Sequence, residues 1–168
     1  MKTSCVWRVI AKQAATNTGP RYRLKFSVPG KKTVVGWRER VDLPEWGVEG
    51  ILAKVDTGAR TSALHVENVR HISEDRVAFE VVRSRKKDAE HKTVEARVVR
   101  ETRVRNTSGH FQERIVVATT MRLGEKEKRI EMTLVSRSHM ICRMLIGRTA
   151  LEGDFLVDVD LRHTSDKP

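Results

Sequence analysis

The sequence has only two cysteines in 168 residues, Cys5 and Cys142, and they lie far apart. This excludes a disulfide framework and a zinc site built on cysteine pairs. A chain without such a framework is typical of a reducing compartment, so we expect a cytoplasmic location. Aromatic residues make up only 5% of the chain, which argues against a surface that stacks nucleic-acid bases.

Long apolar runs are also missing. No stretch reaches the length of about 18 apolar residues that a membrane span needs, so a membrane is not an expected partner. The apolar stretch nearest the N-terminus, residues 6–10, is short and is interrupted by Arg8. We therefore expect no secretory signal.

Acidic residues are absent from residues 1–38, which hold nine Lys or Arg, whereas the rest of the chain holds 24 basic and 22 acidic residues. Residues 1–33 therefore read as a basic, disordered arm, and only this arm would attract nucleic acid. The chain length indicates one folded domain. We expect it over residues 34–162, with a C-terminal tail at 163–168.

Alternation of apolar and polar residues predicts strands over most of this domain. Turn residues at Asn106–Gly109 and Leu123–Lys126 predict two hairpins, and Thr149–Glu152 is the one expected helix, a single turn. The pattern indicates an all-β fold, either a barrel or a sandwich. The expected strands are 34–41, 50–55, 76–82, 93–99 and 155–159, with 98–105 and 111–120 flanking the first turn and 115–121 and 129–135 flanking the second.

The most informative run is Asp56-Thr57-Gly58, which follows a hydrophobic strand. The triplet alone is also a common strand-end turn. In an aspartic peptidase, two carboxylates lie so close that they share one proton, and one acts as base while the other acts as acid. Since Asp-Thr-Gly occurs only once, a second copy of the chain would have to supply the other carboxylate.

The neighbouring residues suit that design. Gly58 lacks a side chain, which lets two such loops face each other closely. The Thr57 hydroxyl could donate across to the facing loop, and Ala59 is small enough to leave room for a substrate.

Three runs carry a family resemblance: Gly36–Glu39, Ala53–His65 and Met144–Leu151. They are similar to the retropepsins, the homodimeric aspartic proteases of retroviruses. They resemble still more closely the bacterial relatives that are called ATP-dependent zinc proteases. The resemblance covers about residues 34–160.

The resemblance implies a retropepsin-like single lobe, a closed β-barrel with one short C-terminal helix, that acts as a homodimer on peptides or proteins. It implies catalysis by Asp56, Thr57 and Gly58, with structural support from Gly147. It also implies a hairpin flap over the substrate. The residues expected to contact substrate are Ala59, Arg60, Ser108, Gly109, His110 and Arg148.

One residue departs from the viral pattern. Viral retropepsins have acidic residues after Asp-Thr-Gly-Ala, whereas this chain has Arg60. Arg60 cannot pair with Arg148, and two unpaired arginines near a cleft favour an anionic ligand. We therefore expect a substrate with acidic residues or a free carboxylate end.

Two alternatives remain open at this stage. One is a zinc-dependent peptidase that uses Asp56 and His65, although the six histidines form no metal-binding motif. The other is a binding module for acidic peptides without catalysis. No cofactor is expected for the aspartic mechanism. The chain has no Gly-x-x-x-x-Gly-Lys-Ser/Thr loop, so any ATP dependence would come from a partner.

Overall fold

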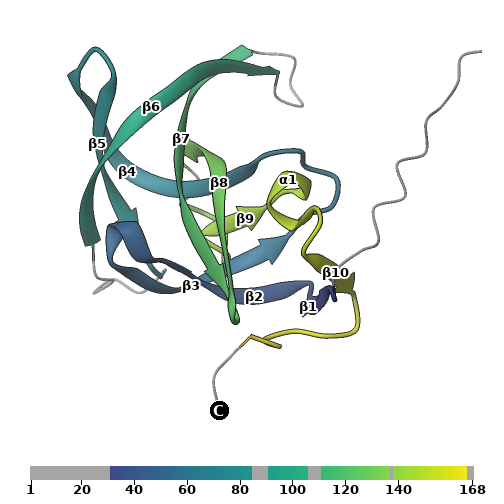
Figure 1. The fold of residues 1–168 in the computed structure, drawn as a ribbon. Coiled ribbons are helices and arrows are strands. Elements are labelled where there is room, and N and C mark those ends of the chain that lie inside the picture. Colours follow the sequence, from purple (N-terminus) through teal and green to yellow (C-terminus); the bar gives the residue numbers. More distant parts are fainter. Residues whose placement is uncertain (1–30, 85–90, 106–110, 137, 166–168) are drawn as a thin grey trace, which may run out of the picture.

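The computed structural model describes residues 31–84, 91–105, 111–136 and 138–165. Within these ranges the chain is mostly β, with one short helix and one 3-10 turn (Figure 1). The expected arm, residues 1–33, lies almost wholly outside them. The elements are β1 (Thr33–Gly36), β2 (Arg38–Leu43), η1 (Pro44–Trp46), β3 (Val48–Val55), β4 (Ser62–Ser73), β5 (Arg76–Val82), β6 (His91–Arg105), β7 (Phe111–Leu123), β8 (Lys126–Val135), β9 (Met144–Ile146), α1 (Arg148–Leu151) and β10 (Phe155–Asp158).

Eight strands form one sheet in the order β2-β3-β9-β4-β5-β6-β7-β8. Two additional pairings, β2 with β7 and β4 with β8, join strands that are distant in this order. β1 and β10 form a separate parallel pair. The all-β prediction is confirmed, and so are the two hairpins, β6–β7 and β7–β8, and the single-turn helix.

Short β-branched and apolar residues fill one core inside this arrangement. In β3, buried Ile51, Ala53 and Val55 alternate with more exposed neighbours, as expected for a strand with one face on the core. Trp46 of η1 packs edge-on against Phe79 of β5, with ring centroids 5.4 Å apart. The core therefore holds β3 rigidly, and β3 ends at Val55, directly before Asp56.

The prediction of one continuous strand over residues 34–41 is wrong. The chain bends at Trp37, so β1 and β2 belong to different sheets. The Trp37 amide donates to the Leu161 carbonyl, and a Cβ on Gly36 would lie 2.2 Å from that same oxygen. The later segment crosses so closely that only glycine fits, and the local pattern does not reveal this contact.

β4 was not predicted. Its first five residues, Ser62–Val66, are all buried, while its last six, Asn68–Ser73, are all exposed. Neither half alternates, because β4 first runs between β8 and β9 in the interior and then extends into the β4–β5 hairpin. Figure 1 shows this hairpin projecting from the body of the molecule.

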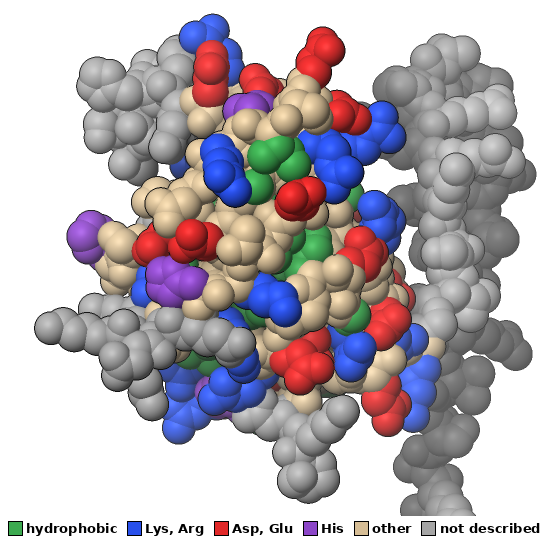
Figure 2. Space-filling model, turned by 90° about the vertical axis from the view of Figure 1, so that its left-hand side faces the viewer, with side chains coloured by type: hydrophobic (Ala, Val, Ile, Leu, Met, Phe, Trp, Pro, Cys, Tyr) green, Lys and Arg blue, Asp and Glu red, His purple; other side chains and the backbone are tan. Residues whose placement is uncertain are grey.

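Charge is mixed on the surface. Figure 2 shows Lys and Arg side chains lying among Asp and Glu side chains on one face of the molecule. The described residues also form cross-strand ion pairs, such as Arg76 with Glu95 at 3.1 Å. In the described part of the chain, no helix is long and apolar enough to cross a membrane.

Glu39 is a buried carboxylate that holds the C-terminal segment. It accepts hydrogen bonds from the Gly36 amide and from both the amides and the hydroxyls of Thr164 and Ser165. Burial alone would raise the pKa of Glu39, but the bonds from Thr164, Gly36 and Ser165 together outweigh it and lower that pKa.

Replacing Glu39 with glutamine is expected to lower the free energy of unfolding by about 1–3 kcal/mol, because the amides and hydroxyls that donate to Glu39 lose a charged acceptor. A lowered folded pKa adds stability above the ordinary glutamate pKa of about 4.3, and this is lost as pH falls through the folded pKa. Urea unfolding should therefore show a large difference from wild type at pH 7 and a smaller one near pH 3. The exposed Glu49→Gln is the control. A difference that does not shrink in acid contradicts this account.

Candidate active site

Asp56 stands at the end of β3, where the core anchors the backbone on both sides. The Val55 amide donates to the Trp37 carbonyl, and the Asp56 amide donates to the Ile146 carbonyl, both at 2.9 Å. β3 pairs in parallel with β9 up to Val55 and Ile146. Asp56 is half-buried, so its carboxylate has both a rigid base and access to solvent.

The loop itself orients the carboxylate. Asp56 Oδ1 accepts hydrogen bonds from the amides of Gly58 at 2.9 Å and Ala59 at 3.2 Å. These bonds make a tight turn of the kind that Asp favours through its side chain. Oδ2 has no hydrogen-bond partner among the described residues, so one carboxylate oxygen is held while the other is available.

The second motif reaches the same loop. Arg148 Nη1 donates to the carbonyls of Thr57 and Gly58, at 2.9 Å each, and the Arg148 amide donates to the Ala59 carbonyl. The prediction that Arg148 is unpaired is wrong, because its guanidinium binds the loop carbonyls of Thr57 and Gly58. A contact between Arg148 and substrate stays a prediction.

Gly147 allows the two segments to touch. A Cβ on Gly147 would lie 2.6 Å from the Thr61 carbonyl carbon and 2.8 Å from the Arg60 carbonyl oxygen. The buried Ser62 hydroxyl accepts the Gly147 amide at 3.1 Å. Thr149 closes the contact, because its hydroxyl and its amide both donate to the Arg60 carbonyl. The loop is thus fastened at several points from the side of α1.

Sequence reasoning did not identify Ser62 and Thr149 as parts of the site. Both lie inside the quoted runs Ala53–His65 and Met144–Leu151, and this was the only signal available for them. Their positions follow from the pairing of β4 with β9, which brings the two runs side by side.

Of the predicted loop residues, Thr57, Gly58 and Arg60 are exposed and Ala59 is half-buried. The β6–β7 hairpin stands above α1 and the β3–β4 loop in the view of Figure 1. β6 residues Arg100 and Thr102 line one groove together with Arg60 and Thr149, so the hairpin borders the space beside the loop. Ser108, Gly109 and His110 lie outside the described residues.

His65 lies in a different environment from Asp56. It is fully buried, its amide donates to the Arg143 carbonyl at 2.7 Å, and its Nε2 lies 3.4 Å from Glu67 Oε1. Burial lowers the pKa of His65, and the charge of Arg143 lowers it further, against the opposite effect of Glu67.

These surroundings do not fit a zinc ion. A guanidinium beside the imidazole would repel a divalent cation, and a protein zinc site needs three or four ligands. In the described ranges, no group of three or more His, Cys, Asp or Glu side chains is placed to hold a metal ion. The described residues around His65 therefore do not form a zinc site.

The geometry combines a carboxylate at a strand end, an Asp-Thr-Gly turn and a Gly-Arg motif that supports it. Residues 34–168 match the model of the RimB-like family, described as retropepsin-like aspartic endopeptidase RimB. The chain belongs to this family. The resemblance to bacterial retropepsin-like proteins is thereby confirmed.

Several known proteins are similar to this chain over most of its length. A probable alpha-L-glutamate ligase of Parasynechococcus marenigrum is 38% identical over 136 residues, covering 79% of this chain and 29% of that protein. One from Shewanella pealeana is 35% identical over 130 residues, covering 76% and 28%. The chain thus spans less than a third of these relatives. The crystal structure of Lpg0085 from Legionella pneumophila, a protein of unknown function, has a TM-score of 0.67 at 25% identity, covering 81% of this chain and all of that one.

Proposed function

We propose that this chain is an aspartic endopeptidase whose catalytic pair consists of Asp56 from each of two copies. The observation that carries the proposal is the Asp56 loop: Oδ1 is held by the loop amides, and Arg148 holds the loop carbonyls. In this proposal each chain supplies one lobe, the retropepsin-like closed barrel that the sequence predicts. The dimer then assembles the site.

The chemistry follows from two carboxyl groups that share one proton. The charged carboxylate removes a proton from a water molecule, whose oxygen attacks the carbonyl carbon of the peptide bond. The protonated carboxyl donates its proton to the carbonyl oxygen, which would otherwise carry the negative charge, and a tetrahedral diol forms. In the second step the C–N bond breaks: the carboxyl that took the proton from water gives it to the leaving nitrogen, and the other carboxylate takes a proton from a diol hydroxyl as the C=O bond forms again. Two rigid, facing loops favour this step because they fix both carboxyls before the substrate binds.

A preference for acidic peptides extends the proposal. It rests on Arg60, which is exposed and lies four residues after Asp56. The relatives named glutamate ligases are consistent with this preference. A ligase that acts on glutamate and a peptidase that accepts acidic peptides both recognise carboxylate side chains. The relatives' name describes proteins more than three times as long as the matched segment, so ligase activity is not carried over to this chain.

Inhibitors separate this function from the alternatives. We expect the purified protein to cleave members of a mixed peptide library, detected by mass spectrometry. A statine-type inhibitor should block cleavage, and a metal chelator should not. Loss of cleavage with chelator and its return with zinc would support a zinc peptidase instead. Peptide binding without any cleavage would support a non-catalytic module.

A further inference from the structure

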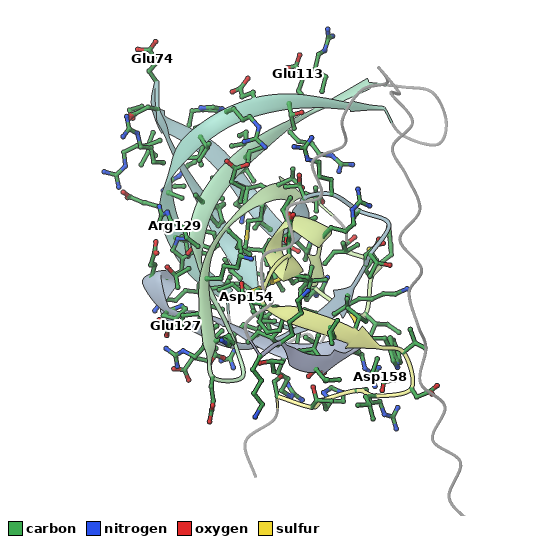
Figure 3. The ribbon with its side chains drawn as sticks, turned by 45° about the vertical axis from the view of Figure 1, so that its right-hand side comes forward. Glu74, Glu113, Glu127, Arg129, Asp154 and Asp158 are labelled. Atoms are coloured by element: carbon green, nitrogen blue, oxygen red, sulfur yellow. The ribbon has the colours of Figure 1, made fainter. Side chains whose placement is uncertain are left out.

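A groove with three arginines opens beside the Asp56 loop. It has a volume of about 690 Å³, and its walls include Arg60, Arg100, Arg129 and Glu131. These residues come from the β3–β4 loop, from β6 and from β8, and Figure 3 labels Arg129. We call this space the arginine groove.

The three arginines differ in their partners. Arg100 Nη1 donates to Glu131, which lies in the same groove. Arg129 pairs with Glu45 at 2.9 Å, and Glu45 is held in turn by Thr120. The Arg60 guanidinium has no ion pair or hydrogen bond among the described residues. Arg60 is therefore available to bind an anion. Arg100 is already paired with a carboxylate of its own chain, that of Glu131.

We propose that the arginine groove binds a peptide through two carboxylates, one at Arg60 and one at Arg100, where the ligand displaces Glu131. Glu131 then sets the specificity of the groove, because it occupies Arg100 until a second acidic side chain competes for it. Guanidinium groups suit this exchange, since they bind carboxylates through paired hydrogen bonds. The proposal rests on the proposed function, which makes the groove part of the substrate cleft.

The exposure of the pair allows this exchange. The side chains of Arg100 and Glu131 are 47% and 42% exposed. Exposed ion pairs contribute little to stability, so breaking one is a small penalty that a ligand carboxylate can offset. Buried pairs would not exchange in this way.

The test measures binding without cleavage. The 168-residue chain with Asp56→Asn is titrated separately into solutions of three labelled short peptides. One peptide carries two adjacent glutamates, one carries a single glutamate, and one carries glutamines in their place. Glu131→Gln is expected to bind the two-glutamate peptide about threefold more tightly, the gain that an exposed ion pair of this kind predicts. Affinity for the other two peptides should be nearly unchanged.

Two further variants make the result decisive. The exposed Glu125→Gln, in the β7–β8 turn, makes the same change of net charge outside the groove and should not alter binding. Arg60→Gln should weaken binding of both glutamate peptides about tenfold, as expected for a charge-assisted contact. The inference is overturned if Glu131→Gln leaves the two-glutamate affinity unchanged, if Glu125→Gln raises it equally, or if Arg60→Gln binds normally.

This outcome is independent of catalysis. If the binding pattern holds but the unmodified chain cleaves no peptide, the peptidase proposal fails and the groove assignment stands. If the unmodified chain cleaves peptides but the binding pattern is absent, the groove assignment fails alone.

Discussion

Asp56→Asn is expected to abolish peptide cleavage and to leave the fold intact. Asparagine keeps the Oδ1 acceptor that the amides of Gly58 and Ala59 bind, so the loop should hold its shape. It cannot take a proton from water, and loss of a general acid–base group typically reduces rates about 10²- to 10⁴-fold. The measurement is cleavage of the best library peptide, together with a melting curve.

The exposed Asp160→Asn makes the same chemical change away from the loop and should behave like wild type. Cleavage that persists in Asp56→Asn at a similar rate would mean that another group performs the chemistry. A large drop in melting temperature would mean that the charge of Asp56 mainly supports the fold.

Gly147→Ala is expected to disrupt the candidate active site by displacing the backbone that continues the Asp56 loop. Its φ is −86°, which any residue adopts, so the effect comes from contact and not from backbone strain. The added Cβ would meet backbone atoms of Arg60 and Thr61, which cannot rotate away as a side chain would. Forced contacts of this kind typically cost about 1–3 kcal/mol. Because the same backbone continues the Asp56 loop, cleavage should fall together with stability.

Gly153→Ala is a useful comparison for Gly147→Ala. Nothing lies within 4 Å of a Cβ at Gly153, but its φ of +88° disfavours alanine. It should therefore lose some stability through strain and keep its cleavage rate in the folded state. If Gly147→Ala retained full cleavage and a wild-type urea midpoint, the close contact between the two motifs would not support the site.

The sequence reveals those parts of the fold that depend on local patterns. The apolar run along β5 and the turn residues between β7 and β8 predict these elements, because most of β5 is buried and the turn joins two adjacent strands. The bend at Trp37 depends instead on Leu161, more than a hundred residues later. The sequence pattern does not predict β4, because one half of the strand is buried and the other half is exposed.

In the candidate site, too, local sequence motifs predict some features, and contacts between distant segments determine the others. The runs that resemble retropepsins identify Asp56, Gly147 and Arg148 as site residues, because Asp-Thr-Gly is followed far downstream by the matching Gly-Arg motif. They do not show that Arg148 is bound to loop carbonyls, which depends on the β3–β9 pairing. The arginine groove also escapes local analysis, since Arg60, Arg100 and Glu131 meet only through the folded sheet.

The most direct test of the shared catalytic pair is a heterodimer of defined composition. Wild-type and Asp56→Asn chains with different tags are co-expressed, and the doubly tagged species is purified. If each site needs Asp56 from both chains, the heterodimer should show no cleavage above the Asp56→Asn homodimer. A heterodimer with about half the wild-type rate would show that each chain carries a complete site, and would contradict the central claim.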